Sequence, residues 1–410
     1  MGNTFLAKVT KSVIHGYSMN IDKKMIKSNI PKIRFNNFKA FWVEKRIADM
    51  VKISAGGDVD KVKLKESGKY PVVANALTNK GIVGFYDDYK VKAPAVTVTG
   101  RGDVGYAVAR HENFTPVVRL LTLQSENIDV DYLENQINSM RILNESTGVP
   151  QLTAPQLGNY KVYHPEIDEQ SAIGSLFRTL DDLLASYKDN LANYQSLKAT
   201  MLSKMFPKAG QTVPEIRLDG FEGEWDLIKL GDFCDLITKG TTGKSQSEQG
   251  MVNFVKVENL KDNEIYPIVK ISEEEHFGSL KRSILYEGDI LFSIAGTLGR
   301  TAIVKNNILP ANTNQALAII RGYKLDAYFL LVVLSGEVVK DYIRKNPTVG
   351  AQPNLSLEQV SSLKIKIPSL DEQQAIGAYF SNLDTLIAAH QEKISQLETL
   401  KKKLLQDMFI

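Results

Sequence analysis

The chain has 410 residues, 43% of them hydrophobic and 24% charged, so it is long enough to bury two hydrophobic cores. Its single cysteine excludes an internal disulfide and a thiolate metal cluster, and its five histidines show no metal-ligand spacing. The net charge of +3 leaves nucleic-acid binding open, because the 50 Lys and Arg residues could still be concentrated on one face.

Residues 1–30 match nothing else in the chain, and we treat them as an N-terminal extension in which Met19 or Met25 is a possible alternative start. Polar residues such as Lys8 and Lys11 interrupt this stretch, so it does not read as a secretory signal. The apolar runs elsewhere are too short to cross a bilayer. We therefore expect a cytoplasmic protein without a membrane partner.

From Pro31 onwards the sequence contains an internal repeat. The pattern Pro-x-Ile-Arg, followed by Phe and Trp, occurs at 31–42 and again at 214–225, an offset of 183 that pairs the only two tryptophans. A longer match at an offset of 203 has sixteen identities in forty positions. Duplicated sequence indicates duplicated structural units. We divide the chain into a first head (head 1, 31–166), a central helix (167–206), a linker (207–213), a second head (head 2, 214–369) and a C-terminal helix (370–410).

Within head 1, Gly100, Gly102 and Gly105 follow a β-branched run, which is the letter pattern of a dinucleotide-binding loop. Such a loop requires a helix directly after it, because the N-terminal amides of that helix bind the pyrophosphate. The residues that follow alternate like a strand instead, which predicts a β-hairpin with a tight turn. Head 2 contains the same strand, Gly-x-x-Gly, strand pattern at Gly296 and Gly299.

The two matching segments, 167–206 and 370–409, show continuous helical periodicity. Their apolar residues recur at alternating steps of three and four, as in a coiled-coil seam. The alternative is that each helix packs on its own head, because an apolar stripe is equally typical of a core-facing helix. The seam residues are Ile173, Phe177, Leu180, Leu184 and Leu191 in the first helix, and Ile376, Phe380, Leu383, Ile387 and Ile394 in the second.

Lys198 and Lys401 interrupt the two seams at matching heptad positions. One interpretation is a pair of lysines whose ammonium groups reach solvent near frayed helix ends. The other is a polar pair that fixes the partner and the register of the helices.

The segment 237–245, ITKGTTGKS, is a near match to an ATP-binding P-loop, but Thr238 occupies the place of the first glycine. A flexible loop whose Lys239 and Lys244 contact phosphate, or a plain solvated loop, fits better. The chain also lacks the proline-proline-aromatic motif of amino-methyltransferases, and it lacks HExxH, GxSxG and a convincing nuclease motif. We therefore predict a protein that is not an enzyme and has no metal or cofactor of its own.

The repeated Pro-x-Ile-Arg pattern, the Asp-Glu-Gln-x-Ala-Ile-Gly helix openings, GDILFSIAGTLG (288–299) and VGAQPNLS (349–356) together resemble the specificity subunit of type I restriction-modification systems. The resemblance covers roughly residues 31–410. It implies an α+β fold with two mixed α/β target recognition domains. Two long helices would separate and join these domains as an antiparallel coiled coil, with an internal pseudo-two-fold repeat.

The resemblance also implies a role in DNA recognition. Each head would read one half of a bipartite, asymmetric DNA site, and the coiled coil would set the spacing and dock two methyltransferase subunits. Translocase or restriction subunits join the full complex, and S-adenosylmethionine, ATP and Mg are expected on the partner subunits only. Independently, two non-identical heads suit an asymmetric target, as a symmetric dimer suits a palindrome. The alternative is a bivalent protein-binding coiled-coil scaffold without nucleic-acid binding.

Candidates for DNA contacts are the donor-rich side chains on predicted loops. Arginine can bind guanine through two hydrogen bonds, asparagine or glutamine can bind adenine in the same way, and lysine more often contacts phosphate. For each candidate the alternative is a solvated surface residue. The candidates are Lys80, Lys90, Lys92, Arg101 and Arg110 in head 1, and Lys239, Lys244, Arg300, Asn312, Asn314 and Gln315 in head 2.

Overall fold

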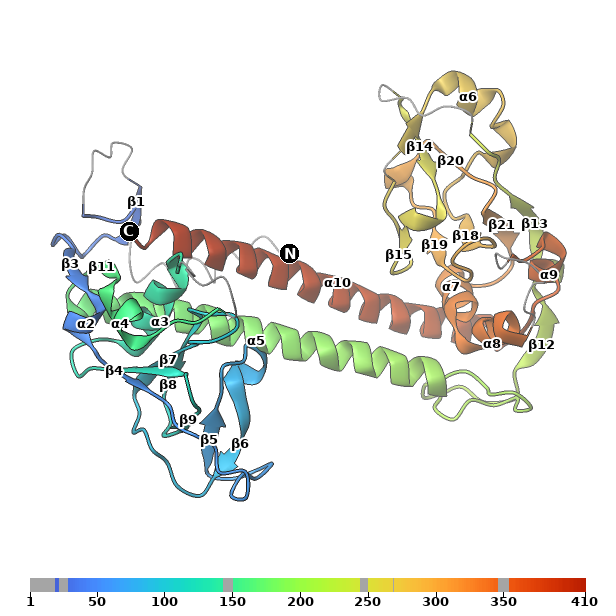
Figure 1. Ribbon diagram of the computed structural model, residues 1–410. Helices are drawn as coiled ribbons and strands as arrows, with labels where there is room; N and C mark the ends of the chain where they lie inside the picture. The colour runs from blue at the N-terminus through green and yellow to red at the C-terminus, as the bar shows by residue number, and fades with distance from the viewer. Residues whose placement is uncertain (1–18, 22–28, 143–149, 244–249, 268, 346–353) are drawn as a thin grey trace. The chain divides into compact units, whose positions relative to one another are not determined.

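The computed structural model describes residues 19–21, 29–142, 150–243, 250–267, 269–345 and 354–410. The chain forms two compact units, one made of Met1–Asp189 with Glu392–Ile410 and the other of Asn190–Gln391. Two long helices, α5 (Ile167–Lys204) and α10 (Leu370–Asp407), each contribute residues to both units (Figure 1). None of the described helices is long and apolar enough to cross a membrane.

Head 1 is built from small sheets and short helices. An antiparallel sheet has the order β4 (Lys52–Ala55), β10 (Leu121–Gln124), β7 (Ala95–Val98), β8 (Ala107–Arg110). A second sheet has the order β6 (Ile82–Tyr86), β5 (Tyr70–Val73), β9 (Thr115–Pro116), with β5 and β9 parallel. Two-stranded pairs join β11 (Lys161–His164) to β3 (Val43–Arg46), and β1 (Met19–Ile21) of the extension to β2 (Ile33–Phe35). The helices are α2 (Ile47–Met50), η1 (Thr78–Gly81), α3 (Val130–Ser139) and α4 (Ala154–Asn159).

Head 2 repeats this topology with additions. Its four-stranded sheet has the order β13 (Cys234–Lys239), β21 (Leu317–Tyr323), β18 (Ile290–Ser293), β19 (Thr301–Ile303). Its second sheet has the order β17 (Val269–Ile271), β14 (Val252–Val255), β20 (Ala311–Thr313), and β12 (Asp226–Lys229) pairs with β22 (Lys364–Ile367). The helices are η2 (Leu230–Phe233), η3 (Val257–Asn259), η4 (Lys281–Ser283), η5 (Asn306–Ile308), α7 (Ala327–Ser335), α8 (Glu337–Lys345) and α9 (Leu357–Ser361). The hairpin β15 (Leu260–Lys261) with β16 (Glu264–Ile265), and α6 (Glu273–Phe277), lengthen this copy.

The glycine motif that resembled a dinucleotide loop is the turn of the β7–β8 hairpin, as predicted. The strands pair from Ala95 with Arg110 to Val98 with Ala107, and no helix follows. Gly102 and Gly105 have φ values of +77° and +87°, which L-residues rarely adopt. Head 2 repeats the hairpin with β18 and β19, including positive φ at the corresponding glycines.

The repeated sequence motifs meet at the start of each long helix. Arg34 of the first Pro-x-Ile-Arg motif donates from Nε and Nη2 to the two carboxylate oxygens of Glu169, both at 2.6 Å. Arg217 makes the same bidentate contact with Glu372, at 2.8 and 2.6 Å. Both glutamates are almost fully buried, so each carboxylate requires its arginine. The pairing ties the Pro-x-Ile-Arg segment at the start of each head, which is strand β2 in head 1, to the long helix that follows that head.

Gln170 and Gly174 of the helix opening fix α3 of head 1. The Gln170 amide donates to the carbonyl of Pro165 and accepts from the backbone N–H of Asp129, the residue that caps α3. A Cβ on Gly174 would lie 2.3 Å from Asp129 Oδ1, so only glycine admits this close approach. Gln373 and Gly377 make the equivalent contacts with Asp326, the cap of α7.

The predicted seams have two roles in the structure. Ile376, Phe380 and Leu383 belong to the core of head 2, so the first turns of α10 pack on that head, as the alternative interpretation had it. In α5, Ile173, Phe177, Leu180 and Leu184 are buried. Further along the helices Ile394 is buried, whereas Leu191 and Ile387 are partly buried.

Contacts within each unit show that α5 and α10 run antiparallel. In the first unit, Lys401 Nζ lies 2.5 Å from Asp181 Oδ1, and Lys188 Nζ lies 2.7 Å from Glu398. In the second unit, Lys198 pairs with Asp384. The two seam lysines therefore pair with aspartates at matching positions of the opposite helix, which supports their role in setting register.

Each head encloses the end of the long helix that belongs to the other head. In the first unit, Phe409 packs against Tyr132 and Phe177, with ring centroids 5.6 and 5.8 Å away. In the second unit, Phe206 packs in the same way against Trp225, Phe329 and Phe380, at 5.9 to 6.1 Å. The repeated Met-Phe ending of the helices is thus a core element of each unit.

Candidate nucleic-acid interface

Five loops of head 1 meet at one end of its sheets. We call them the head 1 loop cluster: residues 56–57, 75–80, 100–105, 117–119 and 150–152. Asn75 holds three of them together, because its Oδ1 accepts from Gly100 N at 2.8 Å and its Nδ2 donates to Val118 O at 3.1 Å. Leu152 N donates to Gly100 O at 2.9 Å, and Gly56 and Val118 form a β-bridge. The cluster is a joined surface in which backbone contacts fix every loop.

The predicted DNA-contact residues of head 1 divide into three groups. Lys80 and Arg101 are exposed on the loop cluster. Lys90 is exposed beside it, with its ammonium 3.6 Å from where a Cβ on Gly57 would lie. Lys92 is exposed, and its carbonyl accepts a hydrogen bond from Gln124. These four side chains stay predictions, since their accessibility is compatible with DNA contact but does not test it.

Arg110 is a correction. Only 7% of this residue is exposed, and its guanidinium donates to Thr97 Oγ1 at 3.0 Å and to the carbonyl of Lys80 at 2.6 Å. Burial, as the largest effect, lowers its pKa to about 10. A β-strand places alternate side chains on opposite faces, and the sequence did not reveal that this one faces inward. Arg110 therefore supports the 75–80 loop from beneath and is not available to DNA.

The sequence interpretation missed two exposed side chains of the cluster. Arg119 and Asn79 both have a left-handed backbone, with φ of +69° and +48°. No sequence signal marked Arg119, because arginine is not a residue that usually adopts this conformation. Asn79 tolerates it better, and the sequence Thr-Asn-Lys-Gly at 78–81 is a recognisable turn.

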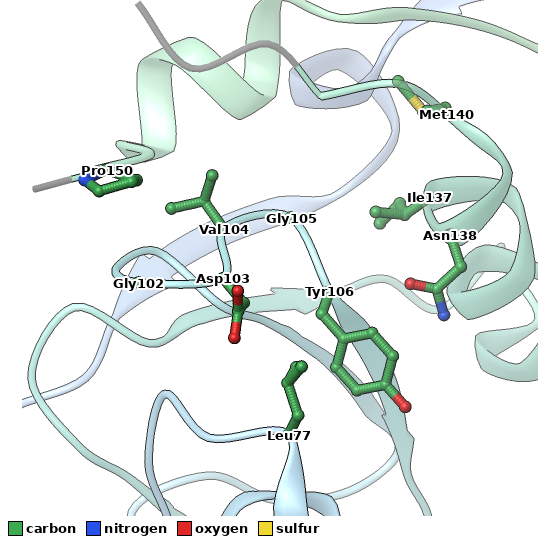
Figure 2. A pocket seen from close by; sticks show the side chains of 10 residues that line it. All are labelled: Leu77, Gly102, Asp103, Val104, Gly105, Tyr106, Ile137, Asn138, Met140 and Pro150. Carbon is green, nitrogen blue, oxygen red and sulfur yellow. The ribbon is translucent and has the colours of Figure 1, made fainter. Parts of the chain in front are cut away.

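A cavity of about 500 Å³ lies beside the hairpin turn, with Leu77, Asp103, Tyr106 and Asn138 among its lining residues (Figure 2). Leu77 and Tyr106 are 48% and 41% exposed, so apolar surface faces solvent next to the polar turn. Asn138 is fixed in place, because its side chain bonds both the N–H and the carbonyl of Ala107. The recess adds shape to the surface on which Arg101 lies.

Head 2 has a corresponding loop cluster, residues 240–241, 255–257, 294–300, 314–316 and 354–355. Asn314 N donates to Val255 O, Ile294 N to Ala316 O, and Leu355 N to Ile294 O, at 2.8 to 3.2 Å. Of the predicted contact residues, Lys239, Arg300 and Gln315 are exposed and Asn314 is partly exposed, and Lys244 lies outside the described residues. Arg300 Nη1 lies 3.3 Å from the carbonyls of Val257 and Leu260.

Asn312 is a second correction. It is fully buried, its Oδ1 lies 2.5 Å from His276 Nδ1, and its Nδ2 donates to the carbonyl of Leu280 at 2.9 Å. It also donates to Ser283 Oγ at 3.2 Å. The three contacts satisfy a buried amide that links α6 and η4 to β20. Asn312 is thus a structural residue and not a reader of bases.

Reactive groups are sparse in the part of the chain that the structure describes. Across those ranges, no group of three or more His, Cys, Asp or Glu side chains is arranged to hold a metal ion. Burial is the main cause that raises the pKa of Cys234 to about 11, so this thiol is a poor nucleophile at neutral pH.

The family model described as "Type I restriction modification DNA specificity domain" matches residues 39–193 and 222–399. The type I restriction enzyme MjaVIII specificity subunit of Methanocaldococcus jannaschii is 24% identical over 271 residues, 64% of this chain and 64% of that protein. The chain thus spans just under two thirds of that relative. A putative type I specificity subunit of Mycoplasma pneumoniae is 24% identical over 369 residues, 88% of this chain and 94% of that one.

Among solved structures, the S subunit of a type I restriction-modification system from M. genitalium is similar in fold. Its TM-score is 0.68 at 18% sequence identity, and the match covers 93% of this chain and 99% of that one. At this identity the likeness shows the fold alone.

Proposed function

Because the chain belongs to the type I restriction-modification DNA specificity family, we propose that it is the DNA-sequence specificity subunit of a type I restriction-modification complex. Each head reads one half of a bipartite, asymmetric DNA site through its loop cluster. The observation that carries the proposal is a repeated topology with different exposed side chains. At the positions where head 1 presents Arg101 and Arg119, head 2 has Ala295 and Ala316, and its own exposed donors Arg300 and Gln315 lie elsewhere on its cluster. Equal frameworks with unequal donors suit two different half-sites.

The long helices are the proposed contact for shared partners. Their sequences are closely repeated, with sixteen identities in forty positions, whereas the loop clusters differ. Two copies of one methyltransferase subunit therefore meet similar surfaces, and the helices set the spacing of the half-sites. Translocase or restriction subunits join the full complex. S-adenosylmethionine, ATP and Mg belong to these partners, so the purified chain alone is expected neither to methylate nor to cleave DNA.

A domain exchange tests this function. Residues 31–166 are replaced by the first head of a specificity subunit with a known, different target, and the complex is reconstituted with its methyltransferase subunits. Mapping of methylated sites is expected to show one half of the motif changed and the other half retained. Size-exclusion chromatography is the control for assembly, and a gel-shift assay then measures DNA binding by the intact complex. A change in both halves, or in neither, would contradict the proposal. If the wild-type complex assembles but does not bind DNA, the result would favour the alternative, a protein-binding scaffold.

A further inference from the structure

Three exposed residues of the head 1 loop cluster hold a left-handed backbone although none is glycine. They are Asn79, Lys80 and Arg119, with φ of +48°, +50° and +69°. In this region the Cβ of an L-residue crowds the following carbonyl, whereas glycine adopts it freely. Lys80 and Arg119 are the unusual cases, because asparagine often tolerates the conformation. Glycine would be the more stable choice at both positions if only the turn mattered.

Contacts on both sides hold Arg119 in this conformation. A Cβ on Gly100 would lie 2.2 Å from the carbonyl oxygen of Arg119, so the hairpin turn and the 117–119 loop are packed backbone to backbone. A Cβ on Gly56 would lie 2.1 Å from the carbonyl oxygen of Val117. Asn75 Nδ2 donates a hydrogen bond to the carbonyl of Val118. The backbone of Arg119 is thus fixed, while its side chain is exposed. No ion pair engages Arg119 or Arg101 within the described residues.

The Asn79–Lys80 turn is supported from beneath. The buried Arg110 donates from Nη2 to the carbonyl of Lys80 at 2.6 Å. Ala74 N donates to the carbonyl of Gly81 at 2.8 Å and closes the loop. A buried guanidinium is thus used to hold a strained turn whose side chains are exposed. Since Asn75 connects this turn to the 100–105 and 117–119 loops, the two strained sites belong to one rigid surface.

From this geometry we infer that Arg119 is a base-reading residue of head 1 and that Lys80 is its phosphate contact. The inference rests on the proposed function and names side chains for it. Strain that a glycine would remove persists at functional sites where the side chain itself is needed. An arginine on a fixed backbone can present its guanidinium fork to the two acceptors of a guanine, and a lysine is suited to phosphate. The half-site of head 1 therefore contains a G·C pair read by Arg119.

The test uses glycine substitutions, because glycine separates function from stability at these positions. Arg119→Gly and Lys80→Gly are assembled with the methyltransferase subunits, and DNA binding and methylation are measured for all single substitutions in the head 1 half-site. Both variants are expected to keep or raise the thermal midpoint. Arg119→Gly is expected to lose about ten- to hundredfold discrimination at one G·C pair. Lys80→Gly is expected to weaken all sequences evenly and to reduce the salt dependence of binding.

Two further variants make the result specific. Arg119→Lys keeps the charge but loses the fork, so discrimination is expected to fall while affinity at low salt is largely retained. Lys161→Ala, which removes an exposed lysine paired with Glu44 outside the loop cluster, is expected to leave motif and affinity unchanged. An Arg119→Gly complex with the wild-type motif and affinity would overturn the inference. The inference would also be overturned if Arg119→Gly lowered both the thermal midpoint and the affinity for DNA. If exchange of residues 31–166 changes the motif while Arg119→Gly does not, only this inference fails and the proposed function stands.

Discussion

Replacing Gly174 with alanine sets a general rule of helix stability against a specific contact. Alanine in place of a glycine within a helix normally stabilises it by about 1 kcal/mol. Here the new Cβ would lie 2.3 Å from Asp129 Oδ1 and 2.9 Å from the backbone nitrogen of Tyr132. Asp129 must then give up its cap of α3, which costs about 0.5 to 2 kcal/mol, and crowding adds about 1 to 3 kcal/mol. We expect a net loss of about 0.5 to 4 kcal/mol in the free energy of unfolding.

Tryptophan fluorescence during urea unfolding measures this effect, because each head contains one of the two tryptophans. A Trp225→Phe background isolates the signal of Trp42 in head 1. Ser175→Ala, at the next and exposed position of the helix, is the matched control and should remain close to wild type. Gly174→Ala at or above wild-type stability would refute the reasoning. The same substitution at Gly377 should reproduce the loss in head 2, since its Cβ would lie 2.3 Å from Asp326 Oδ1.

Three other expectations concern charged groups of the first unit. Glu169→Gln leaves the buried Arg34 without its carboxylate and should lower the free energy of unfolding by about 3 to 5 kcal/mol in urea, whereas a loss below about 1 kcal/mol would contradict the assigned pairing. Asp181→Lys and Lys401→Asp should each lower the thermal midpoint, and the variant with both substitutions should restore it, because the pair is then re-formed with its charges exchanged. Additive effects of the two substitutions would mean that the pair does not act as a unit. Burial first, and then the charge of Asp181, raise the pKa of Glu134 to about 7. The folded state then binds the extra proton between about pH 4.5 and 7, so stability should fall as the pH rises through this window, by up to about 3 kcal/mol. Glu134→Gln should abolish this slope in a pH series of melting curves, and an unchanged slope would point to another group.

Repetition made much of this fold predictable from the sequence. A duplicated Arg and a duplicated Glu, far apart in the chain, become the bidentate pairs of Arg34 with Glu169 and Arg217 with Glu372. The hairpin was predictable for a local reason, because alternation after the glycines is incompatible with a phosphate-binding helix. Periodicity alone left open whether the long helices pack on their heads or on each other. In the structure, the apolar stripe contacts the head over the first turns and the opposite helix further along.

The individual DNA contacts were far less predictable. Arg110 and Asn312 looked like donors for DNA, yet both are buried and bond to neighbouring loops. Which face of a short strand points inward depends on sheets assembled from distant residues, and this does not appear in the local pattern. Arg119 escaped notice because its importance rests on a backbone angle that tertiary packing imposes.

The position of Phe409 bears on how the protein is made in the cell. Head 1 and the start of α5 emerge from the ribosome first, but Phe409, which packs on Tyr132 and Phe177, is translated roughly 200 residues later. At about 5 to 20 residues per second, the aromatic cluster of head 1 waits on the order of 10 to 40 s for its last member. During that interval its apolar surface is open to chaperones and to neighbouring nascent chains. A stop codon just before Phe409 would therefore remove a core side chain from head 1, a domain translated long before that codon.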